Sequence, residues 1–104
     1  MERIRDYSGQ TIRLTDERLA HILEHPEMVG IEGAIGETLL FPHKVVQSLS
    51  DTDAKLYYRL YERTKAGEKY LCVVVKGKPP DPFVVTAYLT DRIKRGELLW
   101  PKTL

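Results

Sequence analysis

Three segments with strand-like alternation fill the second half of this chain, and short turns separate them. They cover residues 55–63, 69–76 and 83–90, with turns at 65–68 and 77–82. Consecutive strands joined so closely pair antiparallel, because a parallel pair needs a crossover of about a dozen residues or more. A further strand-like segment at 44–49 comes before them, across a turn at 51–53. The sequence therefore predicts a four-stranded antiparallel meander.

Two helices are expected before this sheet. Thr15 is a suitable N-cap for a helix over residues 16–24, which begins with two acidic residues and ends where His25 meets Pro26. A second helix is expected over residues 32–40, where apolar residues recur at helical spacing. The shorter predicted elements are strands at 11–14 and 98–100 and one helical turn at 91–96. The predicted fold is α+β, with N-terminal helices packed on one face of the meander sheet.

Size and composition indicate one globular domain, residues 1–104, with 42% hydrophobic and 30% charged residues. No apolar run approaches the roughly 20 residues that a membrane helix needs, and residues 1–6 lack the apolar core of a signal peptide. The single cysteine, Cys72, excludes an internal disulfide and a cysteine-based metal site. We therefore expect a cytoplasmic protein with no cofactor, no resident metal and no membrane contact.

Charge is distributed unevenly along the chain, although the formal net charge is only +1. Residues 1–51 hold 5 Lys and Arg against 9 Asp and Glu, a net charge of −4, whereas residues 52–104 hold 11 against 6, a net charge of +5. A basic, strand-rich half suits a polyanion such as RNA. A solvated lysine-rich surface explains the same charge, and on charge alone it is the simpler interpretation.

The last predicted strand, residues 83–90, has two unlike faces, because side chains alternate along a strand. One face holds Phe83, Val85, Ala87 and Leu89, and we expect it to be buried under the helices. The other face holds Val84, Thr86, Tyr88 and Thr90 and is expected to point outward. Arg59 joins the hydroxyls of that outward face only if the strand register permits, and sequence alone does not fix the register.

Arginine, threonine, tyrosine and histidine make chemical sense together at a phosphodiester. A guanidinium holds phosphate oxygens and neutralises the charge that develops in the transition state. A hydroxyl can donate to a phosphate oxygen, and a histidine titrates near neutrality. Each candidate also has a purely structural explanation: Arg59 as a surface ion-pair partner, Thr86 as a good strand former, and Tyr88 as the cross-strand neighbour of Tyr57.

The two helix histidines, His21 and His25, lie four residues apart and therefore on neighbouring turns. This spacing is also that of a two-histidine zinc helix. The metalloprotease pattern, however, places a glutamate directly after the first histidine, where this chain has Ile22. A histidine-dependent metal hydrolase is therefore the weakest of the alternatives.

Five sequence segments together resemble a phage- and bacteria-associated branch of the BECR nuclease superfamily, which includes barnase, EndoU, colicin-type and RelE-like ribonucleases. The segments are LTDERLAHILEHPEM, ETLLFPHKVVQS, YYRLYE, KYLCVVVK and FVVTAYLTDRIKRG, and they span about Leu14 to Trp100. The resemblance implies a RelE- or barnase-like fold and metal-independent endoribonuclease activity. It also implies the role of a toxin that is paired with a small acidic antitoxin.

Carried over by position, the resemblance assigns catalytic roles to four residues. His21 would be the acid or base, Arg59 the phosphate clamp, Thr86 an oxyanion donor, and Tyr88 a stacking or proton-donating partner. The predicted substrate-binding residues are His25, Tyr57 and Lys94. The net charge of +1 is low for a protein that binds RNA without a partner, because non-specific affinity for RNA comes from neutralising its phosphates. A non-catalytic protein-interaction module with a nuclease-like fold is therefore the alternative function.

Overall fold

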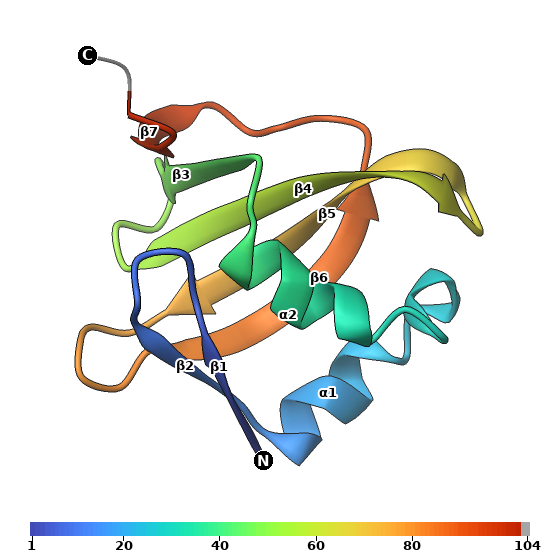
Figure 1. The fold of residues 1–104 in the computed structure, drawn as a ribbon, viewed down its shortest axis with the longest axis horizontal. Coiled ribbons are helices and arrows are strands. Elements are labelled where there is room, and N and C mark those ends of the chain that lie inside the picture. The colour runs from blue at the N-terminus through green and yellow to red at the C-terminus, as the bar shows by residue number, and fades with distance from the viewer. Residues whose placement is uncertain (103–104) are drawn as a thin grey trace.

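The protein is an α+β fold in which two helices pack on a seven-stranded mixed sheet, as seen in a computed structural model that describes residues 1–102 (Figure 1). The elements in chain order are β1 (Glu2–Arg5), β2 (Thr11–Leu14), α1 (Asp16–Ile22), the 3-10 turn η1 (Pro26–Met28), α2 (Gly33–Leu40), β3 (Lys44–Ser48), β4 (Ala54–Thr64), β5 (Gly67–Lys76), β6 (Phe83–Thr90) and β7 (Gly96–Trp100). Within the described residues, neither helix is long and apolar enough to cross a membrane. The predicted α+β class is confirmed.

The sheet runs in the order β1-β2-β6-β5-β4-β3-β7. Strands β3 to β6 pair antiparallel with their chain neighbours, so the predicted four-stranded meander is confirmed as the centre of a larger sheet. Strand β2 adds a parallel pairing with β6, and β7 pairs antiparallel with β3 at the other edge. Strand β1 was not predicted, because its sequence ERIR is charged and mostly exposed and has no apolar alternation.

Local chemistry explains both ends of α1. The Thr15 hydroxyl accepts a hydrogen bond from the backbone N–H of Arg18 at 3.1 Å, which confirms the predicted N-cap. The helix ends at Ile22, two residues before the predicted end, and His25 is extended ahead of Pro26, as the following proline ring requires. The predicted helical turn at 91–96 is wrong, because residues 91 and 92 form bends, residues 93–95 have no regular structure, and β7 begins at Gly96.

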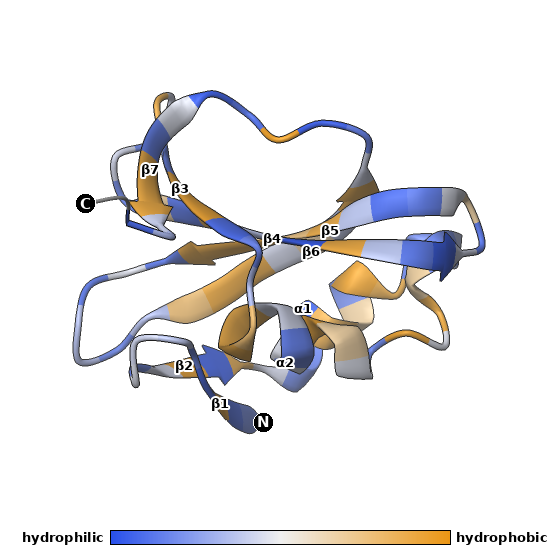
Figure 2. Cartoon of the chain, turned by 45° about the horizontal axis from the view of Figure 1, so that its top comes forward, coloured by the Kyte–Doolittle hydropathy of each residue, from blue (hydrophilic) through white to orange (hydrophobic). Residues whose placement is uncertain are grey.

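Both helices lie on the same side of the sheet, and an apolar layer fills the space between them (Figure 2). The fully buried residues of this main core are Ile12, Ile22, Met28, Ile35, Leu39, Val45, Leu71, Val73, Val84 and Ala87. A second, smaller cluster lies on the opposite face of the sheet, which we call the outer face. It contains Val46, Leu56, Tyr58 and Cys72, with Tyr88 and Ile93 packed against them. The sheet is therefore buried on both faces near its centre.

A β-bulge at Val85 changes which residues of β6 enter the main core. Val74 pairs with Thr86, but the next residue of β5 pairs with Val84, so Val85 is the extra residue. Val84 and Ala87 are fully buried, whereas Phe83 and Val85 are only half-buried. The expectation that Phe83 and Val85 share a buried face with Ala87 is therefore wrong, because the bulge interrupts the period-two alternation.

The β1–β2 turn is held by the buried carboxylate of Asp6, which is 2% exposed. One oxygen, Oδ1, accepts hydrogen bonds from the backbone N–H groups of Ser8 and Gln10 and from the Ser8 hydroxyl, at 2.8 to 3.0 Å. The other oxygen, Oδ2, accepts the hydroxyl of Tyr57 at 2.6 Å. This turn also carries Tyr7, whose ring lies 5.2 Å from that of Trp100 on β7. The turn thus connects the first hairpin to the far edge of the sheet.

Candidate functional site

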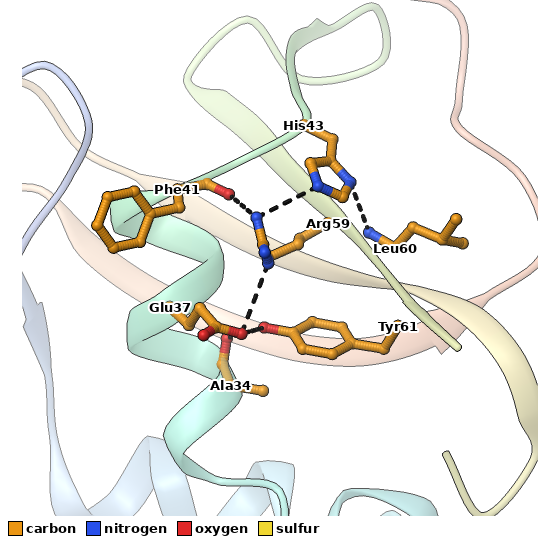
Figure 3. Close-up of polar contacts among 7 residues, drawn as sticks. All are labelled: Ala34, Glu37, Phe41, His43, Arg59, Leu60 and Tyr61. Atoms are coloured by element: carbon orange, nitrogen blue, oxygen red, sulfur yellow. Dashed lines mark hydrogen bonds and ion pairs between the residues drawn. The ribbon is translucent and has the colours of Figure 1, made fainter. Parts of the chain in front are cut away.

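Four chemically capable side chains meet where the end of α2 faces β4 (Figure 3). They are Glu37, His43, Arg59 and Tyr61, and we call them the Arg59 cluster. Glu37 comes from α2, His43 from the loop before β3, and Arg59 and Tyr61 from β4. Two residues apart on a strand, Arg59 and Tyr61 point to the same side of the sheet, toward α2. The cluster combines a carboxylate, an imidazole, a guanidinium and a phenol.

Arg59 is held from several sides but is not fully enclosed, since its side chain is 28% exposed. Its Nη1 donates to the carbonyl oxygen of Phe41 at 2.6 Å and lies 3.2 Å from Nε2 of His43. Its buried Nε makes no hydrogen bond among the described residues and lies 3.5 Å from Glu37 Oε1. Within residues 1–102, Nη2 also makes no hydrogen bond, so this nitrogen can bind an incoming anion.

His43 is oriented by the backbone of β4. Its Nδ1 accepts the backbone N–H of Leu60 at 3.0 Å, so a neutral ring carries its proton on Nε2. Nε2 is also the nitrogen that faces Arg59. Because Nη1 of Arg59 is also a donor, the two nitrogens cannot bond each other in this tautomer, and the ring N–H is left to bind an acceptor placed beside the guanidinium.

Glu37 links Arg59 to Tyr61. The Tyr61 hydroxyl donates to Glu37 Oε1 at 2.5 Å, and its ring lies 5.9 Å from the Arg59 guanidinium. Burial, and next the hydrogen bond to Glu37, raise the pKa of Tyr61 to about 12. Tyr61 is therefore a fixed donor at neutral pH. The Glu37 side chain is 49% exposed, so its carboxylate remains open to a bound substrate.

Two cavities flank α2 near this cluster. One, of about 300 Å³, is lined by Glu37 and Tyr61 themselves, by Arg63, and by the segment that leads into α2. The other, of about 500 Å³, lies between α2 and β1 and includes Glu37 on its rim. Glu37 thus borders both cavities, and the smaller one opens directly onto the Arg59 cluster.

The predicted catalytic residues do not come together. Arg59 pairs with Leu71 of the main core and faces α2, whereas Thr86 and Tyr88 lie on the outer face of the sheet. Tyr88 aligns with Cys72, and Cys72 aligns with Tyr58, so these three side chains form one row across the sheet. The expectation that Arg59 joins Thr86 and Tyr88 is therefore wrong, because the register places the arginine on the other side.

The outer face itself is partly covered by the connection between β6 and β7. The backbone N–H of Lys94 donates to the Tyr58 hydroxyl at 3.1 Å, which fixes this connection over the tyrosine row. Tyr88 is half-buried there, and burial raises its pKa. The Lys94 side chain is exposed. Thr86, Tyr88 and Lys94 thus share a surface, but that surface contains no part of the Arg59 cluster.

The helix histidines, His21 and His25, lie on the exposed surface of α1 and just after it, with ring centroids 6.4 Å apart. His21 lies 3.8 Å from Glu24, one helical turn away. Within the described residues, no hydrogen bond or ion pair joins either histidine to Arg59, Thr86 or Tyr88. Nor does any group of three or more His, Cys, Asp or Glu side chains in residues 1–102 have an arrangement that could hold a metal ion.

Tyr57 has a structural position that contradicts its predicted contact with substrate. Its side chain is 1% exposed and its hydroxyl is committed to Asp6. Burial, and next the hydrogen bond to Asp6, raise its pKa far above the ordinary value. Tyr57 therefore supports the β1–β2 turn and is shielded from any ligand.

Sequence reasoning missed three members of the Arg59 cluster. Tyr61 lies two residues after Arg59 in the predicted strand 55–63, so period-two alternation could have identified it as a neighbour of Arg59 on the same face. His43 directly precedes the strand predicted at 44–49, and the pairing of that strand with β4 brings it beside Arg59. Glu37 lies within the predicted second helix, residues 32–40, and its spacing there does not indicate which strand the helix packs against. The contacts among these residues depend on tertiary packing, which the spacing of residues in the sequence does not predict.

Comparisons with models of known protein families, with curated proteins and with solved structures found no match for this chain.

Proposed function

We propose that this protein is a metal-independent endoribonuclease whose active site is the Arg59 cluster. The observation that carries the proposal is the arrangement of Arg59 between Glu37 and His43, with Nη2 left without a hydrogen bond within the described residues. A guanidinium held in this way offers charge and donors to a phosphate without any need for a metal ion. The neighbouring carboxylate and imidazole provide a proton acceptor and a further donor at the same place.

The proposed reaction is attack of the ribose 2′-hydroxyl on the adjacent phosphorus. Glu37 accepts the 2′-hydroxyl proton while the 2′-oxygen forms its bond to phosphorus. Arg59 binds the non-bridging oxygens and stabilises the charge that builds on them. The bond from phosphorus to the 5′-oxygen breaks, and the leaving oxygen takes a proton from water. The products are a 2′,3′-cyclic phosphate and a 5′-hydroxyl.

His43 has a donor role in this scheme rather than that of a base. Its Nδ1 accepts the backbone N–H of Leu60, so the N–H at Nε2 donates a hydrogen bond to a phosphate oxygen. Tyr61 holds Glu37 through its hydroxyl and thus positions the base. His21, the acid or base that the sequence resemblance implies, takes no part in this scheme, because it lies on α1 without a hydrogen bond or ion pair to the cluster among the described residues.

The sequence resemblance to BECR nucleases supports the same reaction class and a RelE- or barnase-like interpretation of the fold. On that basis we propose that the protein acts in the cytoplasm as the toxin of a toxin–antitoxin pair, with a small acidic protein as its antitoxin. The basic second half of the chain suits both an RNA substrate and an acidic partner. A short acidic open reading frame next to the gene would favour this role.

The decisive experiment measures cleavage of a fluorescent RNA oligonucleotide by purified protein in the presence of EDTA. We expect cleavage with a 2′,3′-cyclic phosphate product and a loss of about 10²-fold or more in Arg59→Ala and Glu37→Gln, since each removes a transition-state contact. Arg18→Ala is the matched control, because it removes the same charge from an exposed position on α1. Full activity in both site variants, or no cleavage by the parent protein, contradicts the proposal.

A second candidate function is protein binding without catalysis, and exposed apolar side chains favour it. Phe41 is 61% exposed directly beside the Arg59 cluster, and Trp100 is 40% exposed on the edge strand β7. Aromatic side chains are enriched at the centre of protein–protein interfaces. A folded protein that never cleaves RNA, yet forms a tight complex with its genomic neighbour's product that Phe41→Ala weakens, would support this function instead.

A further inference from the structure

We propose that the cavity beside Tyr61 binds one unpaired nucleobase, and that the substrate class is therefore single-stranded RNA. This inference rests on the proposed function, because it places the base next to the phosphate that Arg59 holds. The cavity measures about 300 Å³ and is lined by Tyr61, Arg63, Ile31 and Ala34 among others. That volume lies at the lower end of the range for small-molecule sites. It suits a single base and not a base pair.

The position of the cavity is the first argument. Glu37 and Tyr61 line it and also belong to the Arg59 cluster. In RNA, a base and its phosphate are joined through one ribose, so the two sites must be immediate neighbours if a single nucleotide fills both. A cavity with walls that are shared with the phosphate site meets this requirement.

The chemistry of the walls is the second argument. Bases that have left a helix are bound by stacking on aromatic rings or on arginine guanidinium planes. Tyr61 supplies the ring and Arg63 the guanidinium. Arg63 is exposed, and among the described residues it makes no side-chain hydrogen bond and no ion pair, so it is free to contact a ligand. Ile31 and Ala34 add apolar surface for the remaining part of the base.

The test uses two variants that alter the cavity by different means. Gly33 lines the cavity, and a Cβ added there meets no atom within 4 Å, so Gly33→Leu fills space without a backbone clash. Arg63→Ala removes the guanidinium instead. The matched controls are Gly36→Ala, on the same helix but outside this cavity, and Arg18→Ala, which makes the same change of charge. Thermal unfolding checks that each variant is folded.

The first readout is kcat/KM on single-stranded oligonucleotides that differ in the base at each side of the cut, and on the same sequences as duplexes. We expect a base preference at one of these positions, little cleavage of duplexes, and a loss of about tenfold in kcat/KM on the preferred base in both cavity variants. The controls should match the parent. Unchanged kcat/KM and base preference in folded, active cavity variants would overturn the inference while leaving the proposed function intact.

The second readout does not depend on cleavage. Binding of nucleoside 3′-monophosphates is compared with binding of inorganic phosphate by NMR chemical-shift perturbation. We expect the nucleotides to bind about tenfold tighter, an advantage that Gly33→Leu and Arg63→Ala abolish. A protein that fails to cleave RNA but shows this advantage would refute the proposed function and support the base site. Equal affinity for phosphate and nucleotides would overturn the base site. So would cavity variants that bind nucleotides as the parent does but no longer bind a protein partner.

Discussion

Removal of the Tyr57 hydroxyl is expected to destabilise the protein by about 2 kcal/mol. The hydroxyl donates to Asp6 Oδ2 at 2.6 Å in a fully buried position. A hydrogen bond to a charged group contributes about 1.5–3 kcal/mol to stability, and Tyr57→Phe leaves Oδ2 without its donor. The three donors at Oδ1 remain, so the loss should stay within that range. The β1–β2 turn is expected to weaken first, because Asp6 organises it.

Urea unfolding of Tyr57→Phe, followed by circular dichroism, measures this loss. With a typical dependence on urea of about 1–3 kcal/mol per molar, the midpoint should fall by about 1 M, and the melting temperature by roughly 8–16 °C. Tyr70→Phe is the matched control, since Tyr70 is half-buried on β5 and its hydroxyl makes no hydrogen bond among the described residues. It should change stability by less than about 0.5 kcal/mol. Equal midpoints for the two variants would refute the reasoning, and so would a selective loss of RNA binding by folded Tyr57→Phe.

Three further predictions concern alkaline stability, the edge strand and the cysteine. Burial raises the pKa of Tyr58 and of Tyr61 to about 12, so above pH 10 the unfolded chain releases protons that the folded protein retains. The contribution of these two tyrosines to the free energy of unfolding should thus be constant below pH 10 and fall between pH 10 and 12. A urea midpoint that does not fall between pH 10 and 12 would contradict this. Gly96→Ala places a Cβ in steric conflict with backbone and side chain of β3, so we expect a loss of about 1–3 kcal/mol or more in urea unfolding, whereas Gly36→Ala should be neutral or stabilising. Burial raises the pKa of the Cys72 thiol, so a thiol reagent should label it at pH 8 only at the rate of unfolding; rapid labelling of the native protein would show that the outer face opens.

Local sequence patterns predicted most of the elements, because their causes lie within a few residues. The Thr15 cap, the stop before Pro26 and the four central strands each depend on neighbouring residues, and all are present. The pattern failed for β1, whose charged residues are held by pairing with β2 and not by an apolar face. It also failed for 91–96, where the backbone N–H of Lys94 donates to the hydroxyl of Tyr58 on β4 and the segment forms no helical turn.

The candidate site could be predicted only in part. Arg59 was selected for its chemistry, and it is the centre of the proposed site. Its partners were chosen from residues 86 and 88, which lie on the other face of the sheet. A shift of one residue in the pairing of β4 with β5 would have moved Arg59 to that face, because the side-chain period of a strand is two. Sequence alone does not determine this register, since both faces of β4 and β5 carry apolar residues and either face could be buried.

The sequence by itself determined an α+β fold, a central antiparallel meander and a basic second half that carries Arg59, the arginine selected for its chemistry. The tertiary structure decided which residues surround that arginine. Glu37 and His43 reach Arg59 from α2 and from the loop before β3, through contacts between segments 16 to 22 residues apart in the chain. Such contacts depend on the strand register and on helix packing, which arise from the whole core at once. The chemistry of single residues could therefore be predicted from the sequence, whereas the way they assemble into a site could not.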